Sequence, residues 1–266
     1  MNASSRLRAA PLLLLESLGQ RATAGFEEVG RFFTILASTL YWMFRRPFDG
    51  HQWLKQMVRV GVDSLPVVGL TALFTGMVLA LQTYRGFERF HAEAYVGSVV
   101  SLSLTRELAP VLAALMIAGR IGSSLAAELG SMRVTEQIDA LYAMATEPIH
   151  YLIVPRVAAT TLMLPPLVAC ADGLGVLGGY SVAVGLMGAN PVVYWEKTFQ
   201  FLDLNDVFSG LIKAAVFGLI LSVTGCTKGF FTTGGAEGVG RSTTAAVVMA
   251  SVVILVSDFF LTKILF

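Results

Sequence analysis

Long apolar stretches dominate the chain, and their lengths predict helices that cross a membrane. Residues 64–84 carry no charge, and residues 94–119 are apolar apart from one adjacent arginine and glutamate. Three further apolar stretches with isolated charges cover residues 151–188, 206–227 and 242–266. A helix rises 1.5 Å per residue, so about 20 apolar residues cross a hydrocarbon core of about 30 Å. The pattern predicts an all-α integral membrane protein with five transmembrane helices, whose termini lie on opposite sides of the bilayer.

A shorter amphipathic pattern precedes the first of these stretches. Its uncharged part, residues 32–44, is too short to span a bilayer. Aromatic and basic residues at its end, Tyr41, Trp42, Arg45 and Arg46, suit the headgroup region. We expect an interfacial helix in an N-terminal cytoplasmic segment, residues 1–50, ahead of a five-span domain, residues 51–266. The alternative is a soluble amphipathic helix that packs on a partner. The apolar positions recur at the spacing of one helix face: Phe26, Val29, Phe33, Leu36, Leu40 and Met43.

A second short helix is predicted within the polar segment MRVTEQIDALYAMATEP, residues 132–148, between the second and third spans. Thr135 is a candidate N-cap, Glu136 and Asp139 lie in the first turn where the helix dipole favours negative charge, and Pro148 ends the helix. A rod of roughly 16 Å is about half of a hydrocarbon core, so this helix cannot span a membrane. Its apolar stripe is Ile138, Leu141, Tyr142 and Ala145.

The composition agrees with a membrane protein, and the distribution of charge predicts its orientation in the bilayer. The chain is 55% hydrophobic and 14% charged, against about 25% charged residues in soluble domains. Its net charge of +1 excludes the basic field of a nucleic-acid-binding protein. Thirteen Lys and Arg flank the spans on the side of the N-terminus and only four on the other side. The positive-inside rule therefore places the N-terminus and the short polar helix in the cytoplasm, and the C-terminus on the opposite side.

The residue types of an enzyme or a metal site are missing from the spans. The two cysteines form no CxxC pair, and the three histidines lie in segments that flank the spans. The sequence contains neither a G-x-S-x-G nucleophile motif nor a phosphate-binding G-x-x-x-x-G-K-[ST] loop. We therefore expect no catalytic residue, no metal, and no ATP bound by this chain.

Charged residues inside the spans are the candidate chemistry, because each costs on the order of 3 kcal/mol at mid-bilayer. Helix rise places Arg106, Lys213 and Asp258 at similar depths, so we predict that they form one polar cluster with Glu107. Pro110 cannot donate to the carbonyl four residues earlier, which is that of Arg106, so this acceptor should be left free within the cluster. Gln82 and Tyr84, at the end of the first span, are further candidates for the same polar path. Structural ion pairing between helices is the alternative role.

Three segments together resemble a known family. The segment ELGSMRVTEQIDALYAMATEP resembles the E-x-G-x-M-x-V-x-E-Q-I-D-A-L signature of the MlaE (YrbE) permeases, which belong to ABC systems that pair with MCE-domain proteins. GAEGVGRSTTAAVV, residues 235–248, is similar to the family's second signature, and TRELAPVLAALMIAGRIGSSLAAELG, residues 105–130, is similar to its second span. The likeness covers essentially the whole chain from about Phe26.

The resemblance implies a homodimeric permease subunit in a bacterial inner membrane, without ATP-binding residues of its own. A separate cytoplasmic ATPase would use ATP, a hexameric MCE-domain protein would sit outside the membrane, and in many members a STAS-domain protein joins. The implied substrate is phospholipid moved between inner and outer membranes, although relatives handle other lipids such as sterols. The alternative is a non-transporting scaffold that holds the ATPase and the MCE-domain protein.

The resemblance also gives the short polar helix a role, that of a coupling helix that fits a groove on the ATPase and transmits its motion. A helix that merely rests on the bilayer is the alternative. The expected contact set is Glu136, Gln137, Ile138, Asp139, Leu141 and Tyr142.

Overall fold

The computed structural model describes residues 3–43, 45 and 50–265, and its regular elements in that part of the chain are helices. Two 3₁₀ segments, η1 (Val62–Ser64) and η2 (Glu93–Tyr95), and three π-helical segments, η3 (Leu104–Leu108), η4 (Ala118–Gly122) and η5 (Ile149–Ile153), join or extend the α-helices. The α-helices are α1 (Ala3–Met43), α2 (Gly50–Val60), α3 (Leu65–Glu88), α4 (Val96–Ser103), α5 (Ala109–Ile117), α6 (Ser123–Val134), α7 (Gln137–Ala143), α8 (Val154–Gly185), α9 (Pro191–Phe201), α10 (Leu204–Phe230) and α11 (Gly235–Leu265).

The five predicted spans are confirmed as five long apolar helical segments among the described residues. They are longer than the apolar stretches alone, because polar turns extend them beyond the hydrocarbon length: Gly50–Glu88, Glu93–Val134, Ile149–Gly185, Leu204–Phe230 and Gly235–Leu265. Two adjacent prolines, Pro165 and Pro166, lie inside the continuous helix α8. Packing against neighbouring helices allows a transmembrane helix to tolerate the lost backbone hydrogen bonds.

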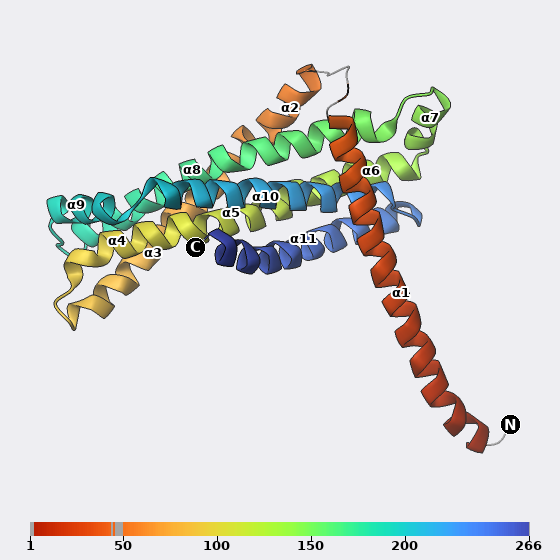
Figure 1. Ribbon diagram of the computed structural model, residues 1–266, viewed down its shortest axis with the longest axis horizontal. Helices are drawn as coiled ribbons and strands as arrows, with labels where there is room; N and C mark the ends of the chain where they lie inside the picture. Colours follow the sequence, from red (N-terminus) through yellow and green to blue (C-terminus); the bar gives the residue numbers. More distant parts are fainter. Residues whose placement is uncertain (1–2, 44, 46–49, 266) are drawn as a thin grey trace.

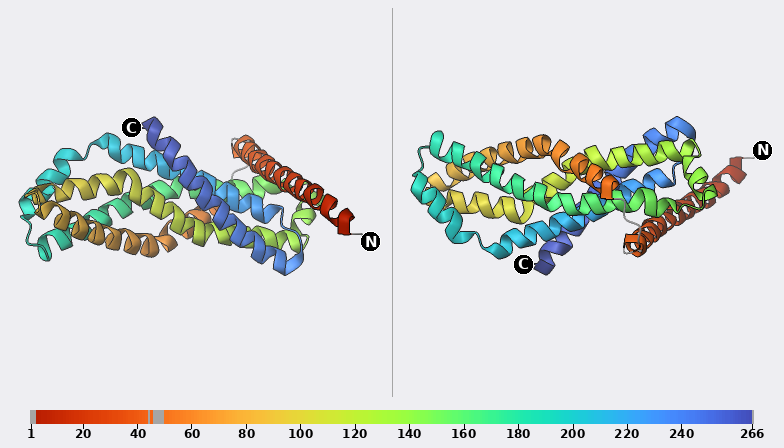
Figure 2. Two further views of the ribbon diagram at one scale, coloured as in Figure 1. Left: turned by 90° about the horizontal axis from the view of Figure 1, so that it is seen from below. Right: turned by 90° about the horizontal axis from the view of Figure 1, so that it is seen from above.

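The spans form an elongated bundle with two distinct ends (Figure 1). At one end lie α7 and the turn between α10 and α11, and at the other lie α9 and the turn between α3 and α4 (Figures 1 and 2). Helix α1 crosses the bundle steeply near the α7 end, and its N-terminal half projects away from the spans (Figure 1). The short polar helix and the N-terminal helix are therefore at the same end of the molecule.

Helix α1 is apolar on two faces. Ile35 and Thr39 are buried on the side that packs against α8, α10 and η5. Most of the predicted stripe points elsewhere: Phe26 is 79% exposed, and Val29, Phe33 and Leu40 are exposed as well. One face thus attaches the helix to the bundle, and the other remains an apolar surface.

The start of helix α7 differs from the sequence prediction. Thr135 was expected to be its N-cap, but Thr135 ends α6, and its Oγ1 donates to the Ser131 carbonyl at 2.9 Å. The chain then reverses at Glu136, which has a left-handed φ of 59° and stands at the N-cap position of α7. The helix ends at Ala143, before Ala145, whose φ of 56° is also left-handed. The reversal is so tight because α6 runs almost directly into α7, which leaves no room for an extended capping residue.

Glycines bring α3 and α8 into close contact. A Cβ on Gly76 would lie 1.9 Å from the Gly175 carbonyl oxygen, and one on Gly178 would lie 2.3 Å from the Leu73 carbonyl oxygen. Gly179 packs beside Val100 and the Tyr194 hydroxyl. Gly175 and Gly179 form a G-x-x-x-G pattern, and their close contacts are to helices of the same chain.

Helix α9 was not predicted, because its eleven residues fall between two spans and are too short to cross a membrane. The Asn190 side chain caps it by accepting from the Val192 and Val193 amides at 2.9 and 3.4 Å. Tyr194 is buried and donates from its hydroxyl to the Val176 carbonyl at 3.2 Å. Helix α9 therefore closes the end of the bundle opposite α7.

We expect Gly76→Ala to lower the stability of the protein by about 1–3 kcal/mol, because the new methyl group would force α3 away from α8. The matched control is Gly86→Ala on the same helix, where a Cβ meets nothing within 4 Å. That change should be neutral or raise stability by up to about 1 kcal/mol. Thermal unfolding of the detergent-solubilised variants measures both, and equal midpoints would contradict the close packing.

Candidate functional site

The amine of Lys213 is the centre of a charge cluster inside the bundle. Lys213 is fully buried on α10, and its Nζ contacts Glu107 Oε2 at 2.7 Å and Asp258 Oδ1 at 3.2 Å. The same Nζ donates to Thr262 Oγ1 at 2.8 Å, and Thr262 Oγ1 donates to Glu107 Oε1 at 3.1 Å. One lysine thus joins η3, α10 and α11 through two carboxylates and a hydroxyl.

A proline leaves a backbone carbonyl free to accept a hydrogen bond from this lysine. Pro110 has no amide hydrogen, so the carbonyl of Arg106 lacks its usual helical donor. Lys213 Nζ donates to that carbonyl at 3.0 Å. Gly210 lets the two segments approach, because a Cβ there would lie 2.3 Å from the Thr105 carbonyl oxygen. The predicted free acceptor therefore exists, and a side chain from another span satisfies it.

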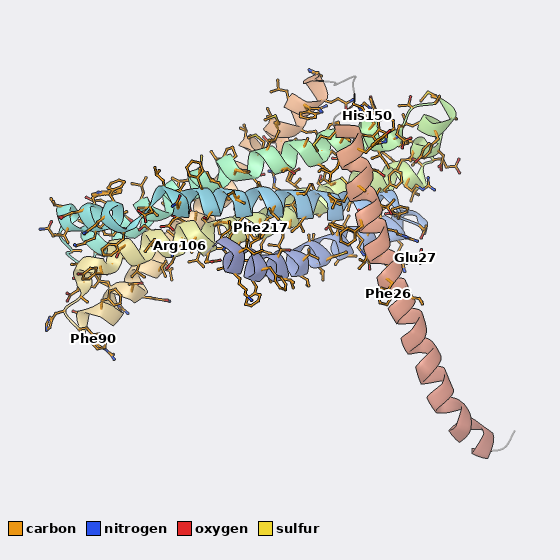
Figure 3. All side chains as sticks on the ribbon, viewed as in Figure 1. Phe26, Glu27, Phe90, Arg106, His150 and Phe217 are labelled. Atoms are coloured by element: carbon orange, nitrogen blue, oxygen red, sulfur yellow. The ribbon has the colours of Figure 1, made fainter. Side chains whose placement is uncertain are left out.

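The side chain of Arg106 turns away from Lys213 toward the start of α10 (Arg106 is labelled in Figure 3). Its Nη2 lies 2.7 Å from Asp206 Oδ1. The second Asp206 oxygen accepts from the Asp203 amide at 3.2 Å, as part of the capping box that begins α10. Sequence reasoning missed Asp206 and Thr262, because Asp206 was taken only as the boundary of a span and an uncharged threonine gave no signal.

The cluster is open on one side. Arg106 is 41% exposed at its side chain and Glu107 37%, whereas Lys213 is 0% and Asp206 4% exposed. With Asp258 the cluster contains three carboxylates and two cations. Lys213 is therefore a fixed internal counter-ion, and Arg106 is the cation that a polar ligand can reach.

Gln82 and Tyr84 are not part of this cluster. Gln82 lines an open apolar groove of about 410 Å³ between α3 and η3, together with Phe74, Val78 and Leu108. Tyr84 lines a separate pocket of about 280 Å³ with Glu93, Asn190 and Tyr194 at the α9 end. The groove is adjacent to the charge cluster in the chain, because Leu108 directly follows Glu107.

Helix α7 presents a mixed surface at the other end of the bundle. Ile138 is fully buried, and Leu141 packs against the same apolar core, so these two predicted contact residues hold α7 to its own chain. Tyr142 and Met144 are 48% and 66% exposed. Partial burial, with the nearby Glu147 carboxylate, raises the pKa of the Tyr142 phenol above its ordinary value, so the phenol stays neutral at physiological pH. Only the Ile138 and Leu141 side of the apolar stripe faces the bundle, and Tyr142 and Ala145 remain exposed.

The polar residues of α7 lie on its outer side. Glu136, Gln137 and Asp139 are exposed, and Asp139 Oδ1 accepts from Arg133 Nη1 at 2.6 Å. The Gln137 amide donates to Thr135 Oγ1 at 3.0 Å. The exposed surface of α7 therefore consists of acidic and amide groups beside Tyr142 and Met144. Among the described residues no group of three His, Cys, Asp or Glu is placed to hold a metal ion.

Known proteins resemble this chain over most of its length. Residues 53–264 match the family described as Permease MlaE. A probable ABC transporter permease protein from Rickettsia bellii is 47% identical over 255 residues, which cover 96% of this chain and 98% of the relative. A probable ABC transporter permease protein from Synechocystis sp. is 50% identical over 213 residues, which cover 80% of this chain and 82% of the relative.

A plant protein is also similar to this chain. The chloroplastic protein TRIGALACTOSYLDIACYLGLYCEROL 1 of Arabidopsis thaliana is 42% identical over 213 residues, which cover 80% of this chain and 61% of that protein. The family match includes the five long helices, the charge cluster and α7. This chain therefore belongs to the MlaE permease family and is an ABC transporter permease with five membrane-spanning helices.

Proposed function

We propose that this permease moves phospholipid between the inner and outer membranes of a bacterium. The observation that carries the proposal is the partly exposed Arg106 side chain at the edge of a buried charge cluster, two residues before Leu108, which lines an apolar groove. A phospholipid is amphipathic, so an arginine suits its phosphate and the groove suits an acyl chain. The printed name of the Arabidopsis relative contains the name of a glycolipid, which supports lipid as the substrate class. Other lipids, such as sterols, lack the phosphate that Arg106 would recognise.

The proposal includes a separate ATPase that binds at α7. A permease of an ABC transporter needs such a partner, and the exposed face of α7 supplies acidic and amide groups around Tyr142 and Met144. Because Ile138 and Leu141 fix α7 to the core, a force on α7 would pass directly to α6 and to the core of the bundle. This attachment favours a coupling helix over a helix that only rests on the bilayer.

The remaining partners follow from family membership. We propose a homodimer in the bacterial inner membrane, with an MCE-domain hexamer at the α9 end and, as a further candidate, a STAS-domain protein with the ATPase. The N-terminus and α7 would then be cytoplasmic and the C-terminus periplasmic. A scaffold that holds these partners without moving lipid would need the Lys213 ion pairs but not the exposed Arg106. The exposed arginine favours transport over the scaffold.

We expect Met144→Asp to abolish stimulation of the partner ATPase, because a buried carboxylate at the interface would have no counter-ion. The fold should be unaffected, since Met144 is 66% exposed. ATP hydrolysis by the permease–ATPase pair is the measurement. Leu186→Asp, at a site 74% exposed at the opposite end, is the matched control and should hydrolyse ATP normally. Normal turnover of the Met144→Asp complex would place the ATPase elsewhere.

We expect Arg106→Gln to reduce phospholipid transfer between vesicles by about tenfold while the protein remains folded, because a charge-assisted contact to phosphate is lost. Lys213→Met should instead lower stability by about 3 kcal/mol, because it leaves the partly buried carboxylates of Glu107 and Asp258 without their cation. Lys263→Gln, an exposed change at the end of α11, is the control for removing a positive charge. Full transfer by the Arg106 variant would assign the cluster a structural role and favour the scaffold.

The orientation predicts which ends of the bundle a membrane-impermeant thiol reagent reaches. With Cys170 replaced by serine, single cysteines at Glu93 and Asn190 should react from the periplasm. A cysteine at Gly235 should react only after the cytoplasmic side is opened. The reverse pattern would place α7 outside the cell and exclude an ATPase contact there.

A further inference from the structure

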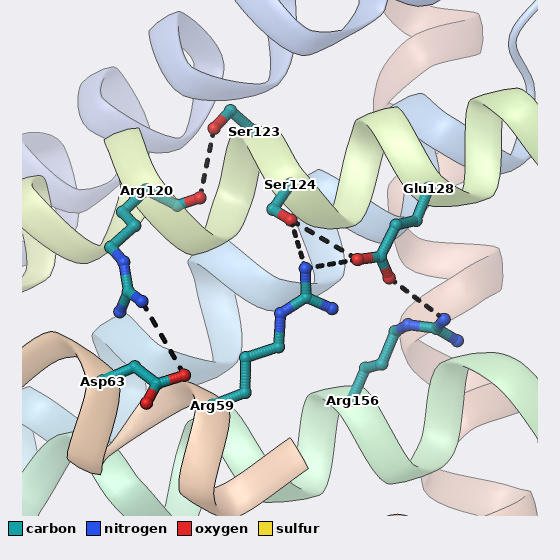
Figure 4. A network of polar contacts seen from close by, with 7 residues as sticks. All are labelled: Arg59, Asp63, Arg120, Ser123, Ser124, Glu128 and Arg156. Carbon is teal, nitrogen blue, oxygen red and sulfur yellow. Dashed lines mark hydrogen bonds and ion pairs between the residues drawn. The ribbon is translucent and has the colours of Figure 1, made fainter. Parts of the chain in front are cut away.

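Two carboxylates of the bundle are paired with arginines of the same chain. Glu128 on α6 accepts from Arg59 of α2 and, at 3.3 Å, from Arg156 of α8 (Figure 4). Asp206 accepts from Arg106 at the start of α10, at 2.7 Å. Basic side chains of this chain therefore satisfy both carboxylates.

Glu93, at the end of the bundle opposite α7, has no such partner. It begins η2, is half-buried, and forms no hydrogen bond or ion pair with another residue in the described part of the chain. Helix α9 packs on η2 and carries Lys197, but that lysine is engaged elsewhere. Its Nζ donates to Gln200 Oε1 at 2.7 Å and lies 5.5 Å from the centre of the Tyr95 ring. Glu93 is therefore a carboxylate that can accept from a cation outside this chain.

Glu93 lines a pocket between η2, the end of α3 and the turn from α8 to α9. The pocket has a volume of about 280 Å³, and its other polar side chains include Tyr84 and Asn190. Within the described residues the Tyr84 hydroxyl, like Glu93, forms no hydrogen bond. Two alanines, Val193 and the buried Tyr194 complete the walls. A carboxylate and a phenol among apolar and aromatic walls suit an organic ammonium group.

Two tight turns hold the walls of this pocket in place. Gly188, between α8 and α9, has a φ of 75°, which glycine adopts without steric cost. The next amide, that of Ala189, donates to the Ala183 carbonyl at 3.0 Å, and Asn190 caps α9. On the other side His91, with a φ of 53°, reverses the chain shortly before η2. The fold itself therefore forms the pocket.

The pocket lies at the depth of lipid headgroups. Tyr84 is the last residue of the uncharged stretch 64–84, and Arg85 follows it. Four aromatic rings at this level contact one another with centroids 5.4 to 5.8 Å apart: Tyr180, Tyr194, Trp195 and Phe199. Aromatic belts of this kind are typical of the membrane–water interface. The volume is below the range of about 300–1,000 Å³ for ligand clefts, so it suits a headgroup rather than a segment of a partner protein.

We propose that this pocket binds the ammonium group of a phospholipid headgroup, that of phosphatidylethanolamine, in the leaflet at the α9 end. Glu93 accepts a charge-assisted hydrogen bond from the ammonium, and the Tyr84 hydroxyl is a second acceptor. The acyl chains stay in the bilayer beside Leu186 and Val192, which are 74% and 70% exposed and flank the pocket residues in the chain. The inference rests on the proposed function for its ligand class, and it deepens that function by assigning an amine-bearing headgroup.

The experiment uses the full chain in detergent and native mass spectrometry with phosphatidylethanolamine and phosphatidylglycerol of identical acyl chains. The unmodified protein should prefer phosphatidylethanolamine by about tenfold, because only this lipid carries the ammonium. Glu93→Gln should remove the preference. Glu88→Gln is the matched control, because Glu88 is exposed at the end of α3 and does not line the pocket, and it should keep the preference.

Tyr84→Phe tests the second acceptor, because it keeps the ring and removes only the hydroxyl. It should lower the preference by about threefold. If Glu93 only stabilised the first turn of its helix through the helix dipole, Glu93→Gln would lower thermal stability and leave the preference unchanged.

Three outcomes would overturn the proposal: no preference in the unmodified protein, an unchanged preference in Glu93→Gln, or an equal loss in Glu88→Gln. A lysine or arginine of a partner protein is the other occupant that a carboxylate suits. It replaces the lipid in this assignment if Glu93→Gln keeps the preference but no longer retains a partner protein during purification. The transfer assay on Arg106→Gln tests the proposed function separately, because Arg106 does not line this pocket.

Discussion

A lysine amine buried among apolar helices must find acceptors for all its protons, and the packing of three segments depends on how Lys213 meets this requirement. Its acceptors come from η3 and α11, while the lysine itself belongs to α10. In a bilayer no water replaces a lost partner, so any movement that separates these segments exposes an unpaired charge. The ion pairs therefore do more than offset the cost of burying these charges. They also fix which helices lie next to each other.

Backbone chemistry makes this contact possible. Pro110 removes a donor from its own helix, and the freed Arg106 carbonyl becomes an acceptor for a side chain of another span. Gly210 removes the side chain that would keep the two segments apart. The glycines of α3 and α8 act in the same way on the other side of the bundle. The close packing of η3 and α10 and the hydrogen bond of Lys213 therefore depend on each other. Lys213 reaches the Arg106 carbonyl because Gly210 lets the two segments lie close together.

The sequence predicts the parts of this structure that depend on local pattern or on depth. Run lengths predict the five spans, and helix rise predicts that Lys213, Glu107 and Asp258 stand at the same level. The sequence does not predict the direction in which a side chain points. Arg106 turns to Asp206 rather than toward Lys213, and Ile138 turns into the core rather than outward, because both choices depend on which neighbouring helix is nearest.

The sequence pattern also does not predict the geometry of the turn between α6 and α7. Thr135 has the residue type of an N-cap, yet the preceding helix continues through it, and a left-handed Glu136 makes the reversal instead. A left-handed residue other than glycine costs on the order of 1 kcal/mol, so it persists only where surrounding packing demands it. The burial of Ile138 supplies that packing, which only the assembled bundle reveals.

The two cations of the charge cluster, Lys213 and Arg106, differ in how fully their acceptors enclose them, and this difference bears on what each can do. Lys213 is enclosed by acceptors, so exchanging one of them for a ligand would gain little. The Arg106 side chain is partly exposed, although its carboxylate partner Asp206 is buried at the start of α10. In the transport that we propose, the enclosed lysine holds the three segments together, and the partly exposed Arg106 beside it is the cation that a headgroup reaches.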